Sequence, residues 1–118
     1  MLTSTVLCLA LIIHNEAGGE KELGKVAVAK VVLNRAKSHK NTCKVIYEKH
    51  QFYTKPIKSK GEHWEKSKQL AKKVLSGHFK DPTNGATHFH NGTVKPKWAK
   101  MKRKTAKIGK HYFYKSLK

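Results

Sequence analysis

The chain has 118 residues, of which 38% are hydrophobic, and carries a formal net charge of +19 at pH 7. This length predicts a single domain over residues 1–118, and the hydrophobic fraction excludes a disordered polycation. The charge predicts salt-sensitive attraction to a polyanion, which could be a nucleic acid, an anionic membrane or an anionic cell wall. Of the 26 basic residues only Arg35 and Arg103 are Arg, the residue that base-reading proteins use for bidentate contacts, so the composition weakens the nucleic-acid interpretation.

The first predicted helix covers residues 4–16 and is apolar on nearly all sides, which is typical of a central core helix. We expect Thr3 or Ser4 to cap its start, and the Gly18-Gly19 pair to end it by adopting positive φ angles. Its apolar stretch is too short to cross a bilayer, and no Lys or Arg precedes Lys21. We therefore expect neither a transmembrane segment nor a signal peptide.

A second helix is predicted over residues 21–37, and a short one over residues 42–49. The second helix should bury one face, made of Leu23, Val26, Ala27, Val31 and Asn34 and widened by Val28, Val32 and Leu33. The short helix should turn Cys43, Ile46 and Tyr47 inward. The segment HQFYTKPIKSKG that follows contains Pro56 and Gly61, and it is predicted to be a surface loop that carries aromatic residues.

A third long helix is predicted over residues 62–76, with Gly77 as its stop and an inward face made of Trp64, Leu70, Ala71, Val74 and Leu75. The later segments GATHFHNGTV and KHYFYKSL predict short antiparallel strands, and Asn91-Gly92 favours a tight reversal. The Lys-rich run between them, residues 95–110, is predicted to be a solvated connection. The predicted fold class is therefore α+β, mainly helical, with a small antiparallel β element in the C-terminal third.

Cys8 and Cys43 are the only cysteines, and they stand in neither a CxxC nor another metal-ligand spacing. Two cysteines do not make a disulfide framework. We expect both to be small buried apolar residues, and a disulfide between them is the less favoured alternative.

Three of the seven acidic residues, Glu16, Glu20 and Glu22, lie within the segment IIHNEAGGEKELG. Glu20 and Glu22 are predicted to sit in or just before the first turn of the second helix, where the helix dipole and free N–H groups stabilise negative charge. Glu16 instead falls at the C-terminal end of the first helix, one turn after Ile12 and Ile13. Both the dipole and the apolar surroundings should raise the pKa of Glu16, as a general acid requires, whereas the surrounding cations should lower it. The alternative is that Glu16 is a capping or ion-paired residue.

Several blocks of the sequence stand together in a characteristic order and spacing. They are NEAGGE, AVAKVVLNR, TCKVIYEKHQF, PTNGATHFHN, VKPKW and IGKHYFY, and they extend from about Leu7 to Tyr114. This succession resembles the cell wall hydrolase family that includes the catalytic domains of spore cortex-lytic enzymes. The resemblance implies a lysozyme-like fold, action on peptidoglycan, and a catalytic acid at Glu16, the first Glu of the family's Glu-Ala-Arg-Gly-Glu motif. The sequence departs from the family's usual residues at His14, Asn15, Gly18 and Tyr53.

The resemblance also implies the chemistry of a lytic transglycosylase. One Glu protonates the glycosidic oxygen between MurNAc and GlcNAc and then activates the sugar's own C6 hydroxyl, which gives a 1,6-anhydro product. Most glycosidases use two carboxylates, but the Gly pair should break the helical geometry between Glu16 and Glu20. The remaining acids lie among Lys residues and suit surface ion pairs; they are Glu48, Glu62, Glu65 and Asp81. No second catalytic carboxylate is predicted, and a hydrolase that uses water on the same bond is the alternative.

A glycan cleft needs flat apolar side chains for the faces of the sugars and polar groups for their edges. The predicted substrate-binding residues are Gln51, Phe52, Tyr53, Thr87, His88, His90, Asn91, Trp98, His111 and Tyr114. Alternation places His88 and His90 on one face of their strand and Phe89 on the other, and Phe89 and Phe113 are predicted to be core residues. A zinc site made by His88, His90 and His111 is a disfavoured alternative, and we expect no metal and no cofactor.

The expected partners are peptidoglycan strands and the anionic cell envelope, with no obligatory nucleic acid, and the chain is expected to be a monomer. With no export signal recognised, the resemblance suggests a stand-alone lysis enzyme such as a phage endolysin. Such an enzyme stays in the host cytoplasm until lysis and then acts on the bacterial wall. The rival interpretation is a non-enzymatic polyanion-binding protein, because the last third of the chain interleaves aromatic residues with Lys.

Overall fold

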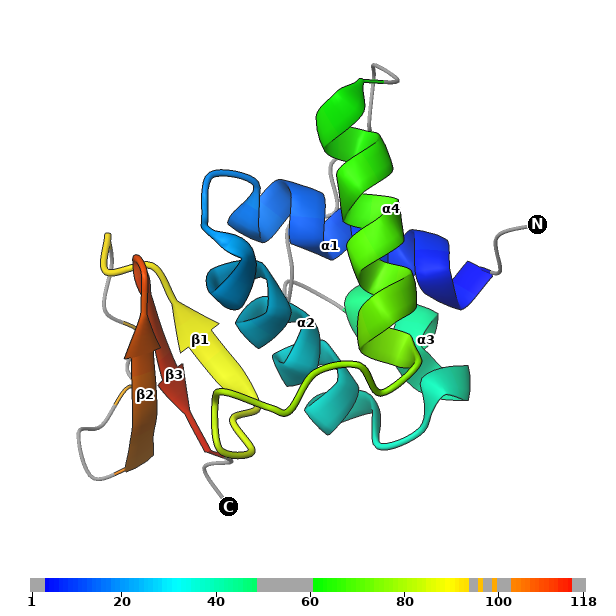
Figure 1. The fold of residues 1–118 in the computed structure, drawn as a ribbon. Helices are drawn as coiled ribbons and strands as arrows, with labels where there is room; N and C mark the ends of the chain where they lie inside the picture. The colour runs from blue at the N-terminus through cyan, green and yellow to red at the C-terminus, as the bar shows by residue number, and fades with distance from the viewer. Residues whose placement is uncertain (1–3, 49–60, 94–95, 97–98, 100–102, 116–118) are drawn as a thin grey trace.

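The computed structural model describes residues 4–48, 61–93, 96, 99 and 103–115. It has a helical body, with a three-stranded sheet at one side of it next to α2 (Figure 1). The elements in chain order are α1 (Ser4–Ala17), α2 (Glu22–Ala36), the 3-10 helix η1 (His39–Asn41), α3 (Thr42–Ile46), α4 (Glu62–Leu75), β1 (His88–His90), β2 (Lys104–Ile108) and β3 (His111–Tyr114). The predicted fold class is confirmed. Within the described ranges, no helix combines the length and the apolar composition that crossing a membrane needs.

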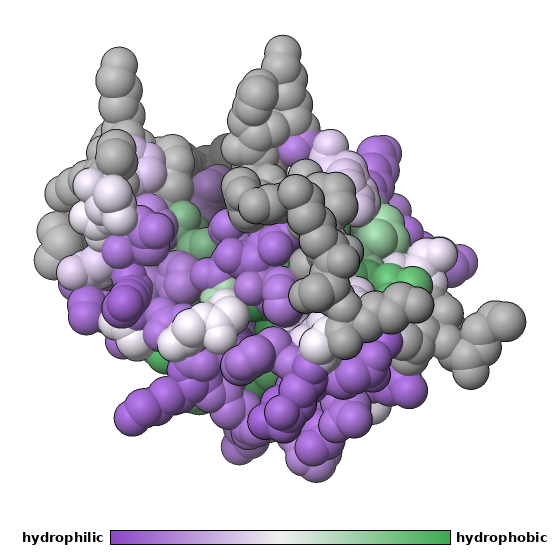
Figure 2. Space-filling model, turned by 90° about the horizontal axis from the view of Figure 1, so that it is seen from above, coloured by the Kyte–Doolittle hydropathy of each residue, from purple (hydrophilic) through white to green (hydrophobic). Residues whose placement is uncertain are grey.

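Helix α1 is the centre of the hydrophobic core and contacts α2, α3 and α4. Leu9, Ile12 and Ile13 are fully buried, whereas Leu7 is 40% exposed. The predicted central core helix is therefore present, with one apolar position facing outward. On the face of the molecule seen from above, hydrophilic residues cover most of the surface and apolar residues show only as small patches (Figure 2).

The Gly18-Gly19 pair follows the last residue of α1, as predicted, but the predicted backbone conformation was wrong. The glycines that adopt positive φ in the described chain are Gly77, Gly85, Gly92 and Gly109. A Cβ atom at Gly18 would lie 2.6 Å from the carbonyl oxygen of His14, which is closer than a Cβ atom can approach. The missing side chain, rather than a left-handed conformation, lets the turn close against the end of α1.

Helices α2 and α3 confirm the predicted pattern of burial with two exceptions. Val26, Val31 and their apolar neighbours on α2 are buried, but Leu23 is 57% exposed because it lies in the first turn, away from the core. The short helix ends at Ile46 rather than at residue 49, so Tyr47 follows it and is 61% exposed. The inward orientations predicted for Leu23 and Tyr47 were wrong.

Helix α4 ends at Leu75, and Gly77 stops it just beyond the C-cap residue Ser76, as predicted. Gly77 has a φ of +81°. Its N–H donates to the carbonyl of Val74 at 3.2 Å, and the N–H of His78 donates to the carbonyl of Lys73 at 3.1 Å. These two bonds form a Schellman motif, which satisfies carbonyl groups at the end of the helix.

The sheet has the order β1-β3-β2, and both pairs of strands are antiparallel. Asn91-Gly92 does not connect two paired strands, because β1 pairs with the distant strand β3, and Gly92 has the positive φ, +86°, that a reversal uses. One prediction was wrong here. The Lys-rich run is not only a connection, because its last part forms β2.

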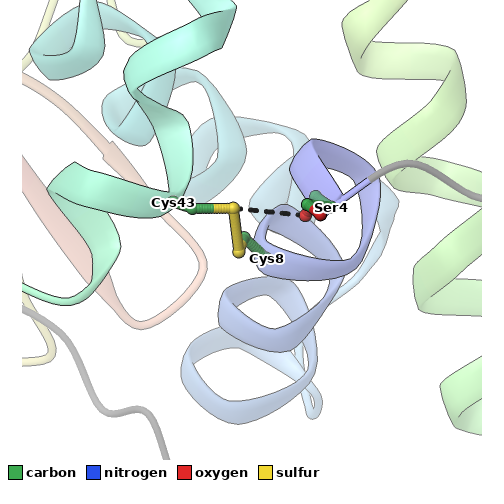
Figure 3. The surroundings of a disulfide bond; sticks show 3 residues. All are labelled: Ser4, Cys8 and Cys43. Carbon is green, nitrogen blue, oxygen red and sulfur yellow. Dashed lines mark hydrogen bonds between the residues drawn. A yellow bond between two sulfur atoms is a disulfide. The ribbon is translucent and has the colours of Figure 1, made fainter.

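Cys8 of α1 and Cys43 of α3 form a disulfide, so the expectation of two unpaired cysteines was wrong (Figure 3). The two helices pack against each other and bring the Cα atoms to 5.4 Å, within the range that a disulfide spans. The bond joins the first half of α1 to α3. It closes a loop with a sequence separation of 35 residues.

Asp81 anchors the loop that leads from α4 to β1. Its carboxylate accepts hydrogen bonds from the backbone N–H and hydroxyl of Thr83, from the N–H of Gly85 and from the side-chain amide of Asn34 on α2. The Asn34 amide also donates to the carbonyl of Ala86 at 2.8 Å. Asp81 is therefore part of a loop network that ties the sheet to α2, and the prediction of a surface ion pair for this residue was wrong.

We expect Asp81→Asn to lower the free energy of unfolding by about 2 kcal/mol at pH 7, because the amide cannot accept all of these hydrogen bonds. Burial alone would raise the pKa of Asp81, but the bonds from Thr83, Asn34 and Gly85 together lower it. The stabilisation is then present above the unfolded pKa of about 3.9 and is lost as the pH falls through the lower folded pKa. Urea denaturation should therefore show a large difference in the free energy of unfolding between the wild type and Asp81→Asn at pH 7, and a smaller difference below pH ~3. Equal free energies of unfolding at pH 7 would show that these hydrogen bonds do not stabilise the fold.

Candidate active site

Glu16 is the penultimate residue of α1 and is half-buried. One turn earlier on the same side of the helix lie Ile12 and Ile13, both fully buried, and the next residue, Ala17, is 1% exposed. The sequence-based placement of this carboxyl group, at the C-terminal end of an apolar helix, is therefore confirmed.

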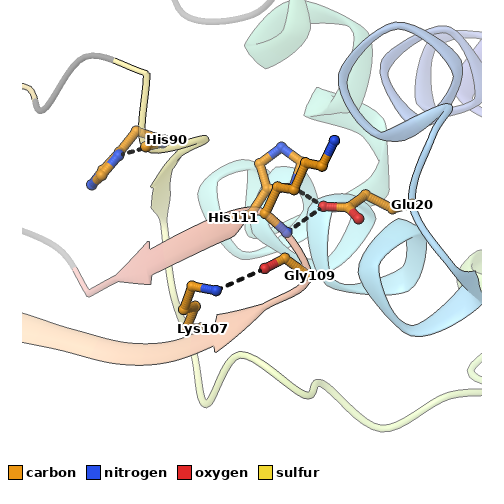
Figure 4. A network of polar contacts seen from close by, with 7 residues as sticks. Glu20, His90, Lys107, Gly109 and His111 are labelled. Carbon is orange, nitrogen blue, oxygen red and sulfur yellow. Dashed lines mark hydrogen bonds and ion pairs between the residues drawn. The ribbon is translucent and has the colours of Figure 1, made fainter.

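Glu20 bridges two distant turns of the chain (Figure 4). It lies in the turn between α1 and α2, and its Oε1 accepts a hydrogen bond from the backbone N–H of Lys110 at 2.8 Å and lies 2.9 Å from Nδ1 of His111. The side chains of Glu20 and His111 are 12% and 6% exposed. Glu20 lies just before the first turn of α2 and Glu22 lies exposed in that turn, as predicted, but the hydrogen-bond partners of the Glu20 carboxylate are in the turn between β2 and β3.

The turn between β2 and β3 is shaped to receive the Glu20 carboxylate. Gly109 has a φ of +58°, and a Cβ atom there would lie 2.5 Å from Oε2 of Glu20. Glu20 also donates its own backbone N–H to the carbonyl of Ala17 at 3.0 Å. The contact therefore fixes the tip of the sheet to the end of the helix that carries Glu16.

Several of the predicted substrate-binding residues lie on the face of the sheet that points away from the core. The ring of His90 stacks against Tyr112 at 5.1 Å and against Tyr114 at 5.4 Å, and its Nε2 lies 3.0 Å from the Tyr114 hydroxyl. Tyr114 is only 2% exposed, and burial raises the pKa of its hydroxyl. The predicted alternation is confirmed, because Phe89 packs on the other face against Phe113.

Three further predicted residues, Thr87, His88 and Asn91, lie at the ends of this face. The Nδ1 atom of His88 lies 2.9 Å from the hydroxyl of Thr87, and burial, together with the nearby charge of Arg35, lowers the pKa of His88. Asn91 lies beyond the other end of β1, in a hollow of about 420 Å³ at the tip of the sheet. The other residues that line this hollow are Gly92, Thr93, Lys107, Gly109, Lys110 and Tyr112.

His111 lies on the opposite, inner face of the sheet, 5% exposed and 5.2 Å from the Phe89 ring. It therefore does not converge with His88 and His90, and the described residues contain no group of three or more His, Cys, Asp or Glu placed to hold a metal ion. Phe89 and Phe113 pack in the core as predicted. Four predicted substrate-binding residues lie outside the described residues: Gln51, Phe52, Tyr53 and Trp98.

Two positions that depart from the resemblance, His14 and Gly18, line one hollow of about 250 Å³ together with Lys25, His63 and Ser67. The His14 ring packs edge-on against Trp64 of α4 at 5.8 Å. Residues two positions apart point to opposite sides of a helix, so this hollow lies on the other side of α1 from Glu16.

The sequence profile described as Cell Wall Hydrolase matches residues 19–114, which is most of the chain. The chain belongs to this cell wall hydrolase family. The matched range contains both Glu20 and His111 and all three strands, and it begins just after Glu16.

Two curated relatives of this cell wall hydrolase are spore cortex-lytic enzymes. The enzyme of Bacillus cereus is 35% identical over 113 residues, an alignment that covers 91% of this chain and 42% of the relative. The enzyme of Halalkalibacterium halodurans is 33% identical over 113 residues, covering 89% of this chain and 33% of the relative. The chain thus spans less than half the length of these relatives.

Two solved structures share the fold of this cell wall hydrolase. The crystal structure of the catalytic domain of the Bacillus cereus SleB protein matches with a TM-score of 0.75 and 31% identity, covering 98% of this chain and 93% of that domain. The catalytic domain of the germination-specific lytic transglycosylase SleB from Bacillus anthracis matches with a TM-score of 0.75 and 32% identity, covering 98% and 97%. The fold of this chain is therefore that of the SleB catalytic domain.

We expect Glu20→Gln to lower the free energy of unfolding of this cell wall hydrolase by about 2 kcal/mol, because it weakens charge-assisted hydrogen bonds at a site with little exposure to solvent. Chemical denaturation followed by circular dichroism measures the change. Glu22→Gln is the matched control, since Glu22 is exposed in the first turn of α2, and it should change stability by less than about 0.5 kcal/mol. Equal effects from both variants would contradict a special role for Glu20.

Proposed function

We propose that this chain degrades peptidoglycan by cleaving the bond between MurNAc and GlcNAc, with Glu16 as the general acid and base. The observation that carries the proposal is the position of Glu16, half-buried at the end of α1 beside the fully buried Ile12 and Ile13. A general acid must lie where a bound substrate can reach it and must be held in place by its surroundings, and a half-buried side chain at a helix end meets both needs. Membership of the cell wall hydrolase family and the similarity to spore cortex-lytic enzymes support a substrate in the cell wall.

The proposed reaction is that of a lytic transglycosylase. Glu16 gives its proton to the glycosidic oxygen as the bond from that oxygen to C1 of MurNAc breaks. The Glu16 carboxylate then takes the proton of the MurNAc C6 hydroxyl, and the C6 oxygen forms a bond to C1. The products are a 1,6-anhydro-MurNAc end and a free GlcNAc hydroxyl, and Glu16 is again protonated.

The contacts of four other acidic residues favour this single-acid scheme. Glu20 accepts hydrogen bonds from the β2–β3 turn, and Asp81 holds its own loop. Glu62 and Glu65 form ion pairs with Lys66 and Lys68 on the surface of α4. Because these carboxylates already serve other contacts, a second catalytic carboxylate of the kind that most glycosidases use is not expected among them.

Mass spectrometry of the digestion products tests the proposal. Purified peptidoglycan is incubated with the wild type and, as a blank, with Glu16→Gln. Anhydro-ended muropeptides from the wild type alone are the expected result. Reducing ends in their place would indicate the muramidase-type hydrolase on the same bond, and equal, slight release by both proteins would contradict enzymatic cleavage.

The second candidate function is non-enzymatic binding of a polyanion, and the net charge of +19 favours it. Nucleic-acid binding would show as tight association with DNA and a steep fall in affinity with salt, without any release of muropeptides. The same purified protein therefore serves both assays, and the pair of results selects one function.

A further inference from the structure

Six side chains share the face of the sheet that points away from the core, and we call it the outer sheet face: His88, His90, Lys104, Lys107, Tyr112 and Tyr114. The register pairs His88 and Lys104 with Tyr114, and pairs His90 and Lys107 with Tyr112. Directly paired residues of antiparallel strands have their side chains on the same face. The inner face, by contrast, consists of Phe89, Ala106, Ile108, His111 and Phe113, and these residues pack on the core.

An irregularity in β2 brings both lysines onto the outer sheet face. Residues 104 and 107 are three positions apart, so strict alternation would place their side chains on opposite faces. The register shifts by one residue between Lys104 and Ala106, which makes Thr105 an extra residue in β2. This bulge turns Lys104 to the same side as Lys107.

Tyr112 is enclosed from both sides by the neighbouring strands. His90 on β1 stacks on its ring with an interplanar angle of 16°, and the ammonium groups of Lys104 and Lys107 on β2 lie over the ring at 5.8 and 5.3 Å. Because β3 lies between β1 and β2, the Tyr112 ring is flanked by an imidazole from one neighbouring strand and by two ammonium groups from the other. The outer sheet face therefore offers ammonium, imidazole and hydroxyl groups to a bound molecule.

The segment of the chain that forms this face carries charge of one sign. From Pro82 to the end, the chain contains nine Lys and one Arg but no Asp or Glu. A second hollow, of about 530 Å³, is lined by Arg103, Lys104, Thr105 and Lys115. Lysines thus line both this hollow and the one at the sheet tip, and the outer sheet face connects the two. Such a line of cations fits a linear polymer that carries acidic groups at intervals.

We propose that the outer sheet face binds the carboxylate groups of a peptide-substituted glycan strand, with Lys104 and Lys107 as the groups that recognise them. This inference rests on the proposed function and adds a binding surface to it. The hollow at the sheet tip includes Gly109 and Lys110, the turn that Glu20 holds beside the end of α1. A strand bound along the outer sheet face would therefore lead toward Glu16.

Sedimentation with insoluble peptidoglycan measures this binding, in the Glu16→Gln background so that no cleavage intervenes. We expect Lys104→Gln/Lys107→Gln to weaken binding about fivefold, since two partly exposed ion pairs contribute about 1 kcal/mol together. The control Lys72→Gln/Lys73→Gln removes the same charge from the exposed surface of α4 and should weaken binding less than about twofold. Lys104→Arg/Lys107→Arg should retain the wild-type affinity.

Chemical amidation of the wall carboxylates provides the second arm of the experiment. The difference between the Lys104→Gln/Lys107→Gln variant and its parent should disappear on amidated peptidoglycan. The inference would be overturned if the difference in affinity persisted on amidated peptidoglycan, or if the Lys72→Gln/Lys73→Gln control lost as much affinity as the sheet variant. It would also be overturned if the sheet substitutions weakened binding of single-stranded DNA more than binding of peptidoglycan. Failure of the proposed function is distinguishable, because it shows as an absence of muropeptide products from the wild type whatever the binding result.

Discussion

Replacement of Glu16 by Gln is expected to lower the rate of peptidoglycan cleavage by about 10²- to 10⁴-fold, because the amide can neither donate the acidic proton nor act as a base. The side chain keeps its size and hydrogen-bonding capacity, so the thermal midpoint should change by no more than a few degrees. Release of soluble muropeptides from insoluble peptidoglycan measures the rate.

Glu22→Gln is the matched control for this substitution. Glu22 lies six residues further along the chain and is exposed, and its replacement is the same Glu-to-Gln change. The Glu22→Gln variant should cleave peptidoglycan at a rate within about twofold of the wild-type rate, because an exposed charge contributes little to a distant site. A Glu16→Gln variant that retained the rate of the Glu22→Gln variant would assign the catalysis to another residue.

Removal of the disulfide is expected to have the largest effect on stability. Cys8→Ser/Cys43→Ser should lower the free energy of unfolding by about 4 kcal/mol, because the bond closes a long loop and limits the unfolded ensemble. Urea denaturation of the oxidised wild type and the double variant measures the difference. Reduction of the wild type should produce a similar loss, and a change below about 1 kcal/mol in both experiments would show that the unfolded chain is not restricted by this bond.

The long helices could be predicted because each has a repeating apolar pattern and a recognisable end. The fully buried Leu9, Ile12 and Ile13 follow from the unbroken apolar run in α1, and the end of α4 follows from Gly77. Positions near helix ends were predicted less well. Leu23 and Tyr47 fit the helical spacing of apolar residues but lie where the helix leaves the core, and spacing alone does not show where that happens.

Contacts between distant segments could not be predicted, because they depend on how the elements pack. The pairing of Cys8 with Cys43 depends on the approach of α1 to α3, and two cysteines without a motif give no sign of it. The contact of Glu20 with His111 crosses 91 residues of sequence, so the local helix dipole was the only partner that the sequence suggested for Glu20. Asp81 was similarly assigned to its Lys neighbours, although its hydrogen-bond donors are Thr83, Gly85 and the distant Asn34.

The candidate site could be predicted in part. The end of α1 with Glu16 and the face that carries His90 and Tyr114 follow from helix boundaries and from strand alternation. Tyr112 was missed, although it could have been found. It lies two residues before Tyr114, and strand alternation places both side chains on one face. Lys104 and Lys107 could not be found in this way, because a bulge at Thr105 brings them to the same face and the sequence of β2 does not reveal it.

The most direct measurement of the central claim is a crystal structure of the Glu16→Gln variant with a bound MurNAc-GlcNAc tetrasaccharide. A general acid must reach the atom that it protonates, so the side-chain amide nitrogen of residue 16 is expected within about 3 Å of a glycosidic oxygen between MurNAc and GlcNAc. A glycan bound away from the end of α1, or a bound strand whose scissile oxygen lies closest to a different carboxylate, would contradict the assignment of the cleavage to Glu16.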